Sequence, residues 1–154
     1  MRKLIFNFVV CFLVLAVVVP AYGQLSRFAG TWKNVDPNTR GVTKLAIKTT
    51  PSVTVHAWGA CTPKDCDWGI VKAVAYAPSV TSDLVTTAKA IIAIYKPSHA
   101  ETIVVIRPYG KSQLKAEVYT KFTDGSKRTD YCNTFIFKRL LLKPIKQLKV
   151  KEKK

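Results

Sequence analysis

The chain has 154 residues, of which 25 are Lys or Arg and 9 are Asp or Glu, and its formal net charge is +16. This length suits one domain with its own core and is too short for two once an N-terminal segment is removed. The basic balance favours polyanionic partners such as nucleic acid, acidic polysaccharide or anionic lipid, although a merely solvated basic surface has the same composition.

Residues 1–23 have the three parts of a secretory signal peptide. Arg2 and Lys3 give a basic start, residues 4–19 form an apolar run, and small residues precede a predicted cut before Gln24. The apolar run is shorter than the roughly 20 residues that span a bilayer, which favours cleavage over an uncleaved anchor. We therefore expect a secreted or periplasmic protein whose mature chain carries 25 − 2 = 23 basic and 9 acidic residues.

The positive charge is concentrated at the C-terminus. Residues 138–154 contain eight basic residues and one acid, Glu152, which amounts to half of the net charge of +14 on the mature chain. We expect a β-barrel domain over residues 24–139 and a basic tail over 140–154. The tail is a candidate for binding anionic surfaces through Lys143, Lys146, Lys149, Lys151, Lys153 and Lys154.

Three cysteines follow the predicted cut. In an oxidising compartment Cys61 and Cys66, which bracket a short polar segment, are expected to form a disulfide. Cys132 lies in strand-like sequence, where a buried free thiol is expected. A metal site would have to recruit the two loop cysteines and their neighbours, and their spacing does not match a zinc knuckle, so no metal is expected.

The chain alternates β-branched and aromatic runs with turn residues and shows no long helical period. Strands are predicted over 28–35, 42–48, 53–58, 68–76, 88–95, 102–107, 114–122 and 129–137. Residues 79–87 fit either a short helix capped by Ser82 or an irregular loop. Short turns between successive strands predict an all-β fold, an eight-stranded antiparallel up-and-down barrel; an open or two-layer sheet is the alternative.

Two of the predicted strands carry small residues along one face. Val55 and Ala57 alternate with His56 and Trp58, and Ala73 alternates with bulkier neighbours on the following strand. If these small faces point inward, a barrel of eight strands is underfilled and has room for one small ligand. Large residues from the opposite strands could instead fill the space, and the sequence leaves both arrangements open.

The start of the first strand resembles the calycin group, which includes lipocalins and avidin-like proteins. Gly30 and Trp32 match the Gly-x-Trp motif of that group, and Arg139, or Lys138 beside it, stands where the group has a basic residue packed over the tryptophan. The resemblance implies an exported barrel with Trp32 at its closed end. It does not extend to a biotin site or to the lipocalin pattern of disulfides.

The residues favour a binding protein over an enzyme. The expected function is binding of a small apolar ligand in the barrel interior, with Trp58, Trp68, Tyr76, Tyr95 and His56 as candidate ligand contacts. A cationic binder of anionic surfaces is the first alternative and a weak hydrolase the second. No catalytic residue or cofactor is assigned, and a histidine in a cleft with a carboxylate behind it would favour the hydrolase.

Overall fold

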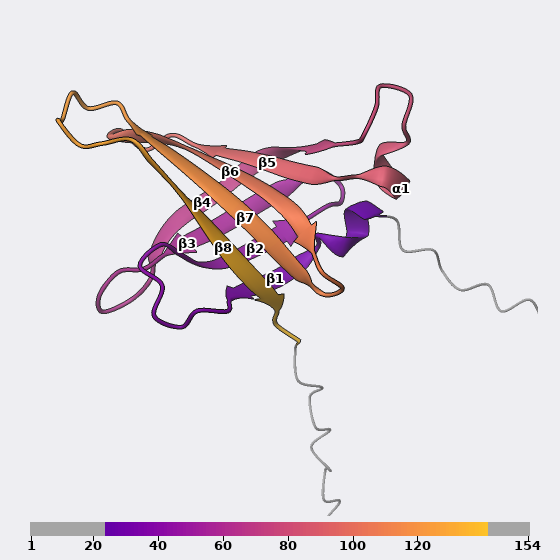
Figure 1. The fold of residues 1–154 in the computed structure, drawn as a ribbon, viewed down its shortest axis with the longest axis horizontal. Helices are drawn as coiled ribbons and strands as arrows, with labels where there is room; N and C mark the ends of the chain where they lie inside the picture. Colours follow the sequence, from indigo (N-terminus) through magenta and orange to yellow (C-terminus); the bar gives the residue numbers. More distant parts are fainter. Residues whose placement is uncertain (1–23, 142–154) are drawn as a thin grey trace, which may run out of the picture.

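Eight antiparallel strands close into one barrel in the computed structural model, which describes residues 24–141 (Figure 1). Each strand pairs with its sequence neighbours, and β8 pairs with β1 through Trp32 opposite Arg139. The predicted up-and-down barrel is therefore confirmed, and the ladder between the first and last strands rules out the open sheet. The predicted cleavage site and most of the basic tail, residues 142–154, lie outside the described residues.

The elements follow one another along the barrel wall with short connections. Their bounds are η1 Gln24–Arg27, β1 Gly30–Asn34, β2 Val42–Lys48, β3 Thr54–Gly59, β4 Cys66–Tyr76, α1 Leu84–Thr87, β5 Ala90–Tyr95, β6 Ala100–Tyr109, β7 Gln113–Phe122 and β8 Tyr131–Arg139. The first strand is shorter than predicted, because a 3₁₀ turn takes up the residues before it. The short helix α1 is capped by Asp83, whose carboxylate accepts from the backbone of Val85 and Thr86, and not by Ser82.

Strand β6 runs through Pro108, where the sequence predicted a stop. Pro108 is paired with Leu114 of β7, whereas the ladder to β5 ends at Ile106. The end of β6 therefore has a neighbour on one side only. Proline is tolerated at such an edge because no second ladder needs its missing N–H group.

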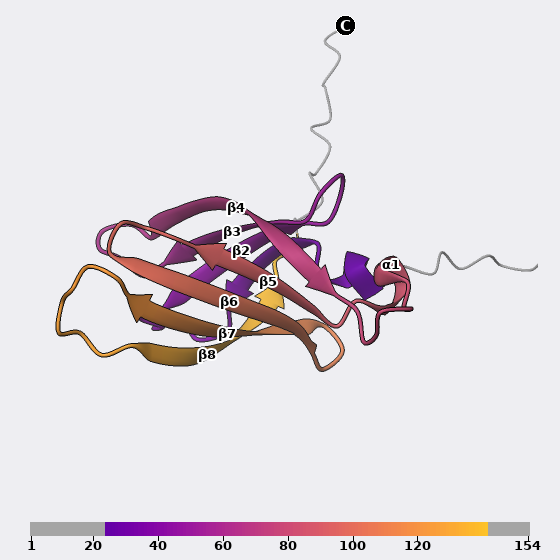
Figure 2. The same ribbon diagram turned by 90° about the horizontal axis from the view of Figure 1, so that it is seen from above.

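The two ends of the barrel differ. One end, which we call the mouth, carries the connections β1–β2, β3–β4, β5–β6 and β7–β8 (Figures 1 and 2). The short helices η1 and α1 lie together at the other end (Figures 1 and 2). Phe28 and Trp32 are almost fully buried near this second end, and Phe137 and Leu45 pack with them in the same core cluster. Large side chains therefore fill the closed end.

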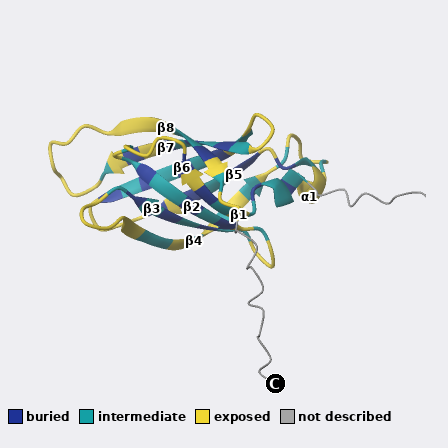
Figure 3. Ribbon diagram, turned by 90° about the horizontal axis from the view of Figure 1, so that it is seen from below, coloured by how far each residue is buried: buried dark blue, intermediate teal, exposed yellow. Residues whose placement is uncertain are grey.

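Successive side chains along each strand point alternately to the inner and the outer face of the barrel wall. Figure 3 shows this as alternating buried and more exposed residues. On β7, Leu114, Ala116 and Val118 are buried, whereas Tyr119 is exposed. This is the period-two pattern of a sheet with one face in the core. On β3 the small-residue face points inward, since Val55 and Ala57 are both fully buried.

A β-bulge moves one residue to a face that simple alternation does not predict. The β3–β4 register pairs His56 with Ile70 but Trp58 with Asp67, so β4 has one extra residue in this interval. Gly69 supplies the required positive φ of 80°. As a result Trp68 packs against the barrel core, although alternation from Ile70 would place it outside.

Cys132 is free but exposed, so the predicted burial is wrong. It is paired with Tyr119 on β7, whose side chain is exposed on the outer face. Counting by twos from the buried Phe137 puts Phe135 inside and Cys132 outside. The aromatic neighbours that suggested burial belong to the opposite face of the strand.

No helix among residues 24–141 is long and apolar enough to cross a membrane.

Candidate functional site

A cavity of about 720 Å³ opens at the mouth of the barrel. Apolar and aromatic side chains form much of its wall, and charged groups stand among its lining residues. It is lined by Cys61, Cys66, Asp67, Trp68, Val71, Tyr95, Lys96, Pro97, His99, Ala100, Thr102, Thr120, Phe122, Arg128 and Tyr131. The barrel is thus filled at one end and hollow at the other, so both arrangements that the sequence left open are present in different halves.

Trp68 is the largest side chain of the cavity wall, and two glycines put it there. The bulge at Gly69 turns it inward, and the missing side chain of Gly59 leaves room for its ring. A Cβ atom on Gly59 would lie 2.7 Å from the indole nitrogen of Trp68, closer than real side chains approach. The indole meets the ring of Tyr95 edge-on, with 5.6 Å between centroids, a favoured aromatic geometry.

Tyr95 fixes the position of the cavity wall relative to β3. Its side chain is 97% buried and its hydroxyl donates a 2.9 Å hydrogen bond to the backbone carbonyl of Val55. Burial, and to a lesser degree the negative charge of Asp67, raise the pKa of the Tyr95 phenol. The phenol is therefore a neutral donor whose hydrogen is already engaged, and it presents its ring to the cavity.

Two threonines supply the buried polar groups of the cavity. Thr102 and Thr120 face each other across the β6–β7 ladder, and their hydroxyl oxygens are 3.3 Å apart. Each hydroxyl has one donor and two acceptor positions, so the pair keeps unused hydrogen-bonding capacity. A polar group of a bound molecule could hydrogen-bond there.

Charged residues surround the mouth but are largely paired with one another. Lys96 binds Glu101 at 2.8 Å, and Arg128 binds Asp124 at 2.6 Å while lying 3.8 Å from the ring centre of Phe122. Hydrogen bonds from Ser126 and then Arg128 lower the pKa of Asp124 to about 2. These pairs leave the rim polar without a strong excess of either charge.

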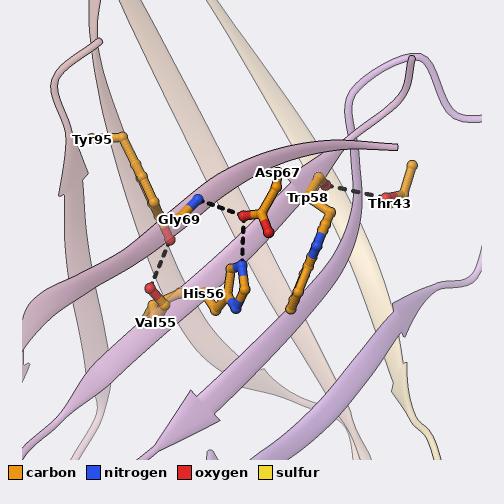
Figure 4. Close-up of polar contacts among 7 residues, drawn as sticks. All are labelled: Thr43, Val55, His56, Trp58, Asp67, Gly69 and Tyr95. Atoms are coloured by element: carbon orange, nitrogen blue, oxygen red, sulfur yellow. Dashed lines mark hydrogen bonds and ion pairs between the residues drawn. The ribbon is translucent and has the colours of Figure 1, made fainter. Parts of the chain in front are cut away.

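The five predicted ligand contacts are divided between the two faces of the barrel. Trp68 and Tyr95 line the cavity, whereas Tyr76 is 48% exposed and, like Ile70 and Val74 on the same strand, faces solvent. His56 and Trp58 alternate with the buried residues of β3 and lie on the outer wall (Figure 4). The structure therefore brings together two of the five candidates.

His56 and Trp58 form an outer cluster with Asp67. The two rings stack with 3.6 Å between centroids, and His56 Nε2 lies 2.6 Å from the Asp67 carboxylate, which also accepts from the backbone N–H of Gly69 (Figure 4). The bond from Gly69, followed by the one from His56, lowers the pKa of Asp67. This cluster fastens the bulge of β4 to β3.

The His56–Asp67 pair is the carboxylate-backed histidine that the hydrolase alternative required. However, among residues 24–141 no serine, threonine or cysteine is hydrogen-bonded to His56, so the geometry of an activated nucleophile is not assembled. No group of three potential metal ligands occurs in the same part of the chain. His99, exposed in the β5–β6 turn, lines the cavity and has no hydrogen bond to a carboxylate of the described residues.

The disulfide Cys61–Cys66 was predicted and is present, and it adds a wall to the cavity. Sequence reasoning missed Thr102, Thr120, Phe122 and Tyr131, which belong to three strands that meet at the mouth. The inward alternation on β7 pointed to Thr120 and Phe122. Nothing in the local sequence indicated which end of the barrel is hollow, because this depends on side chains from opposite walls.

Comparisons with known proteins gave no match to a family, to a curated protein or to a solved structure. The protein is therefore defined by its architecture, a closed eight-stranded antiparallel barrel with a hollow mouth and a local disulfide.

Proposed function

We propose that this protein is an exported, calycin-like barrel that binds one small apolar ligand in the cavity at its mouth. The observation that carries the proposal is the cavity itself. Its volume of about 720 Å³ lies within the roughly 300–1,000 Å³ typical of small-molecule sites. Its walls combine aromatic rings with a few buried hydroxyls, which is also typical of such sites.

The calycin-like part of the proposal is supported by the closed end of the barrel. The guanidinium of Arg139 lies over the ring of Trp32 at 4.3 Å from its centre, as the resemblance implied. The export part is supported by the sequence of residues 1–23 and by the disulfide, which suits an oxidising compartment.

The expected ligand is largely apolar with one or two polar atoms. Trp68, Tyr95 and Phe122 offer ring surface, and the Thr102–Thr120 pair offers hydrogen bonds deep in the wall. Because the charges at the rim are paired, recognition depends mainly on removing apolar surface from water, worth roughly 25 cal/mol per Å² buried.

A neutral fluorescent probe, N-phenyl-1-naphthylamine, tests the proposal without interference from the protein's charge. Val71 on β4 lines the cavity, whereas Val74 on the same strand is 56% exposed on the outer wall. Val71→Trp should therefore weaken probe binding by about tenfold or more, since one extra buried ring displaces most of a ligand's contacts. The matched change Val74→Trp should leave binding unchanged.

Equal effects of the two substitutions, or no saturable binding by the unmodified protein, would contradict the proposal. Circular dichroism and urea unfolding of both variants establish that the barrel is intact in each case.

Binding of anionic surfaces through the lysines of residues 143–154 is the second candidate function. It is supported by the charge of the rest of the chain, because residues 24–141 alone carry 17 basic and 8 acidic residues, a net +9. Co-sedimentation with anionic vesicles at low and high salt, with full-length protein and with a chain ending at Arg139, tests this candidate. Tail-dependent, salt-sensitive binding supports it, and binding unchanged by truncation contradicts it.

A further inference from the structure

The outer wall of the barrel carries a row of lysines on three adjacent strands. Lys33 of β1 is directly opposite Lys44 of β2 on one side and Lys138 of β8 on the other. All three alternate with inward-facing neighbours, so they share the outer face. Neighbouring strands are about 4.8 Å apart, and like charges placed directly opposite one another destabilise a sheet.

Among residues 24–141 this repulsion is offset only in part, by the contact of Lys44 with Trp58 and by its attraction to Asp67. Within residues 24–141 the ion pairs are made by other residues, and none involves Lys33, Lys44 or Lys138. The ammonium group of Lys44 lies 3.7 Å from the ring centre of Trp58. The acid closest in register is Asp67, opposite Trp58, and its carboxylate is engaged by His56 and Gly69.

A second pair of lysines runs parallel to this row. Lys48 of β2 and Lys72 of β4 both pair with Thr54 of β3, one from each side. Lys48 is four residues from Lys44 along β2, and both face outward because Leu45 and Ile47 are buried. At about 3.3 Å per residue the two lysine rows are therefore separated by roughly 13 Å.

Small and polar residues occupy the space between the lysine rows. Thr31, Ala46 and His56 face one another on β1, β2 and β3, with Ile70 of β4 at the end. A groove of about 440 Å³ lies over these residues, and Lys48 belongs to its lining. This outer groove is separate from the cavity at the mouth, because it lies on the opposite face of the same strands.

We propose that the outer groove binds an extended anionic glycan, a chain of sugars bearing carboxylate or sulfate groups. A linear polyanion in the groove brings negative charge close to both lysine rows and relieves the repulsion between the lysines. The threonine hydroxyls that line the groove, Thr31, Thr49, Thr50 and Thr54, can hydrogen-bond to sugar hydroxyls.

The shape of the groove and its lining, which contains no Phe, Tyr or Trp among the described residues, favour a glycan over other polyanions. A membrane surface is flat, so it would contact the two lysine rows without filling the groove between them. Single-stranded nucleic acids gain much of their affinity by stacking bases on free aromatic faces. The nearest indole, Trp58, already has His56 stacked on it and the Lys44 ammonium 3.7 Å from its ring centre, so a base would have to displace these contacts.

Two sets of charge-matched variants of the full chain test the groove. In the first, Lys33, Lys48, Lys72 and Lys138 are changed to Gln; in the second, Lys64, Lys89, Lys111 and Lys127, which are exposed and lie outside the groove, are changed to Gln. Binding of a sulfated oligosaccharide of the heparin type and of oligogalacturonate is measured at about 0.15 M salt, where exposed charges act over only about 8 Å.

The first set should weaken binding of at least one of the two glycans by about tenfold or more. Lysines that contact the glycan release the counterions bound to it, whereas distant lysines do not. The second set should change binding by less than about threefold at this screening length. Equal losses in both sets would overturn the proposal, because they would reduce the effect to overall charge.

A substitution that leaves the charge unchanged tests the hollow itself. Ala46→Trp fills the floor of the groove, and Thr134→Trp places the same ring on the outer face of β8. Ala46→Trp should weaken glycan binding by about tenfold, since it removes the contacts of the glycan with the floor of the groove. Thr134→Trp should leave binding unchanged. No effect of Ala46→Trp would contradict a groove-bound chain.

An oligothymidylate of equal charge is the competitor in the final arm. Weaker binding than the glycan supports the proposal; tighter binding with the same dependence on the groove lysines would overturn the assignment to glycans in favour of nucleic acid. Circular dichroism and urea unfolding show in every variant that the barrel is intact.

Discussion

Arg139 at the end of the last strand lies over Trp32 in the first, with its guanidinium carbon 4.3 Å from the centre of the indole. The same guanidinium donates hydrogen bonds to the backbone carbonyls of Arg27 and Ala29. One side chain thereby joins β8, β1 and the turn before β1, and it covers the filled end of the barrel.

Replacing Arg139 by Gln should destabilise the protein by roughly 1–3 kcal/mol, because the cation–π contact and two charge-assisted hydrogen bonds are lost together. Lys138→Gln, one residue away and exposed, should change the free energy of unfolding by less than about 0.5 kcal/mol. Urea unfolding of both variants measures this. Similar values for the two would show that Arg139 does not hold the closed end together.

Gly30 is required by both backbone and space. Its φ is +120°, and a Cβ atom there would lie 2.6 Å from a guanidinium nitrogen of Arg139. Gly30→Ala should cost roughly 1–3 kcal/mol of stability. Gly110→Ala, also at positive φ but with open space around it, should cost only the backbone part of about 1 kcal/mol. A smaller loss at Gly30 than at Gly110 would contradict the close packing.

These two positions show what the sequence could predict. A short motif, Gly-x-Trp with a distant basic residue, located Gly30, Trp32 and Arg139 correctly, because their contact is fixed by strand order once the barrel closes. The strands themselves followed from alternating hydrophobicity, which depends only on local sequence. The predicted ends of the strands were less accurate. In β6, for example, pairing with β7 extends the strand through Pro108.

The candidate site was harder to predict for a physical reason. One inserted residue in β4, accommodated by Gly69, reverses the direction in which Trp68 points, and a pattern of alternation carries no sign of it. His56 and Trp58 seemed suited to the barrel interior by residue type alone, but β3 places them, half-buried, on the outer face. The hollow mouth arises from the fit of opposite walls, which a single strand does not encode.

The exposure of Cys132 predicts rapid reaction with a thiol reagent in the native state. Of the cysteines at residues 24–141, Cys61 and Cys66 are bonded to each other, so native protein should react with one equivalent of reagent in this region. Protein starting at Gln24 and titrated with a chromogenic disulfide tests this, and the Cys132→Ser variant should not react. Reaction only after unfolding would contradict the outward position of Cys132.

The contacts of Asp67 predict a specific dependence of stability on pH. The pKa of Asp67 is lowered from 3.8 by bonds from Gly69 and then His56, so folding favours the ionised form. The stabilisation by ionised Asp67 is therefore complete above the pKa of Asp67 in the unfolded chain. It is lost as the pH falls through the lower pKa of Asp67 in the folded protein. Asp67→Asn should be less stable than the unmodified protein at pH 7, and the difference should shrink as the pH falls and disappear below the folded pKa.

Urea unfolding at pH 7, 4 and 2.5 or so follows this convergence, with the two proteins compared at each pH so that other carboxylates cancel. A difference that stays constant down to the lowest pH would show that the charge of Asp67 does not stabilise the bulge.

The central claim, that the mouth cavity binds an apolar ligand, is tested most directly by tryptophan quenching with a brominated medium-chain alcohol. Trp68 lines the cavity, Trp58 lies on the outer wall and Trp32 is buried at the closed end. Because bromine quenches an indole only near contact, saturable quenching should persist in Trp58→Phe and disappear in Trp68→Phe. Quenching that survives the loss of Trp68 and disappears with Trp58 would place the ligand outside the barrel and contradict the account.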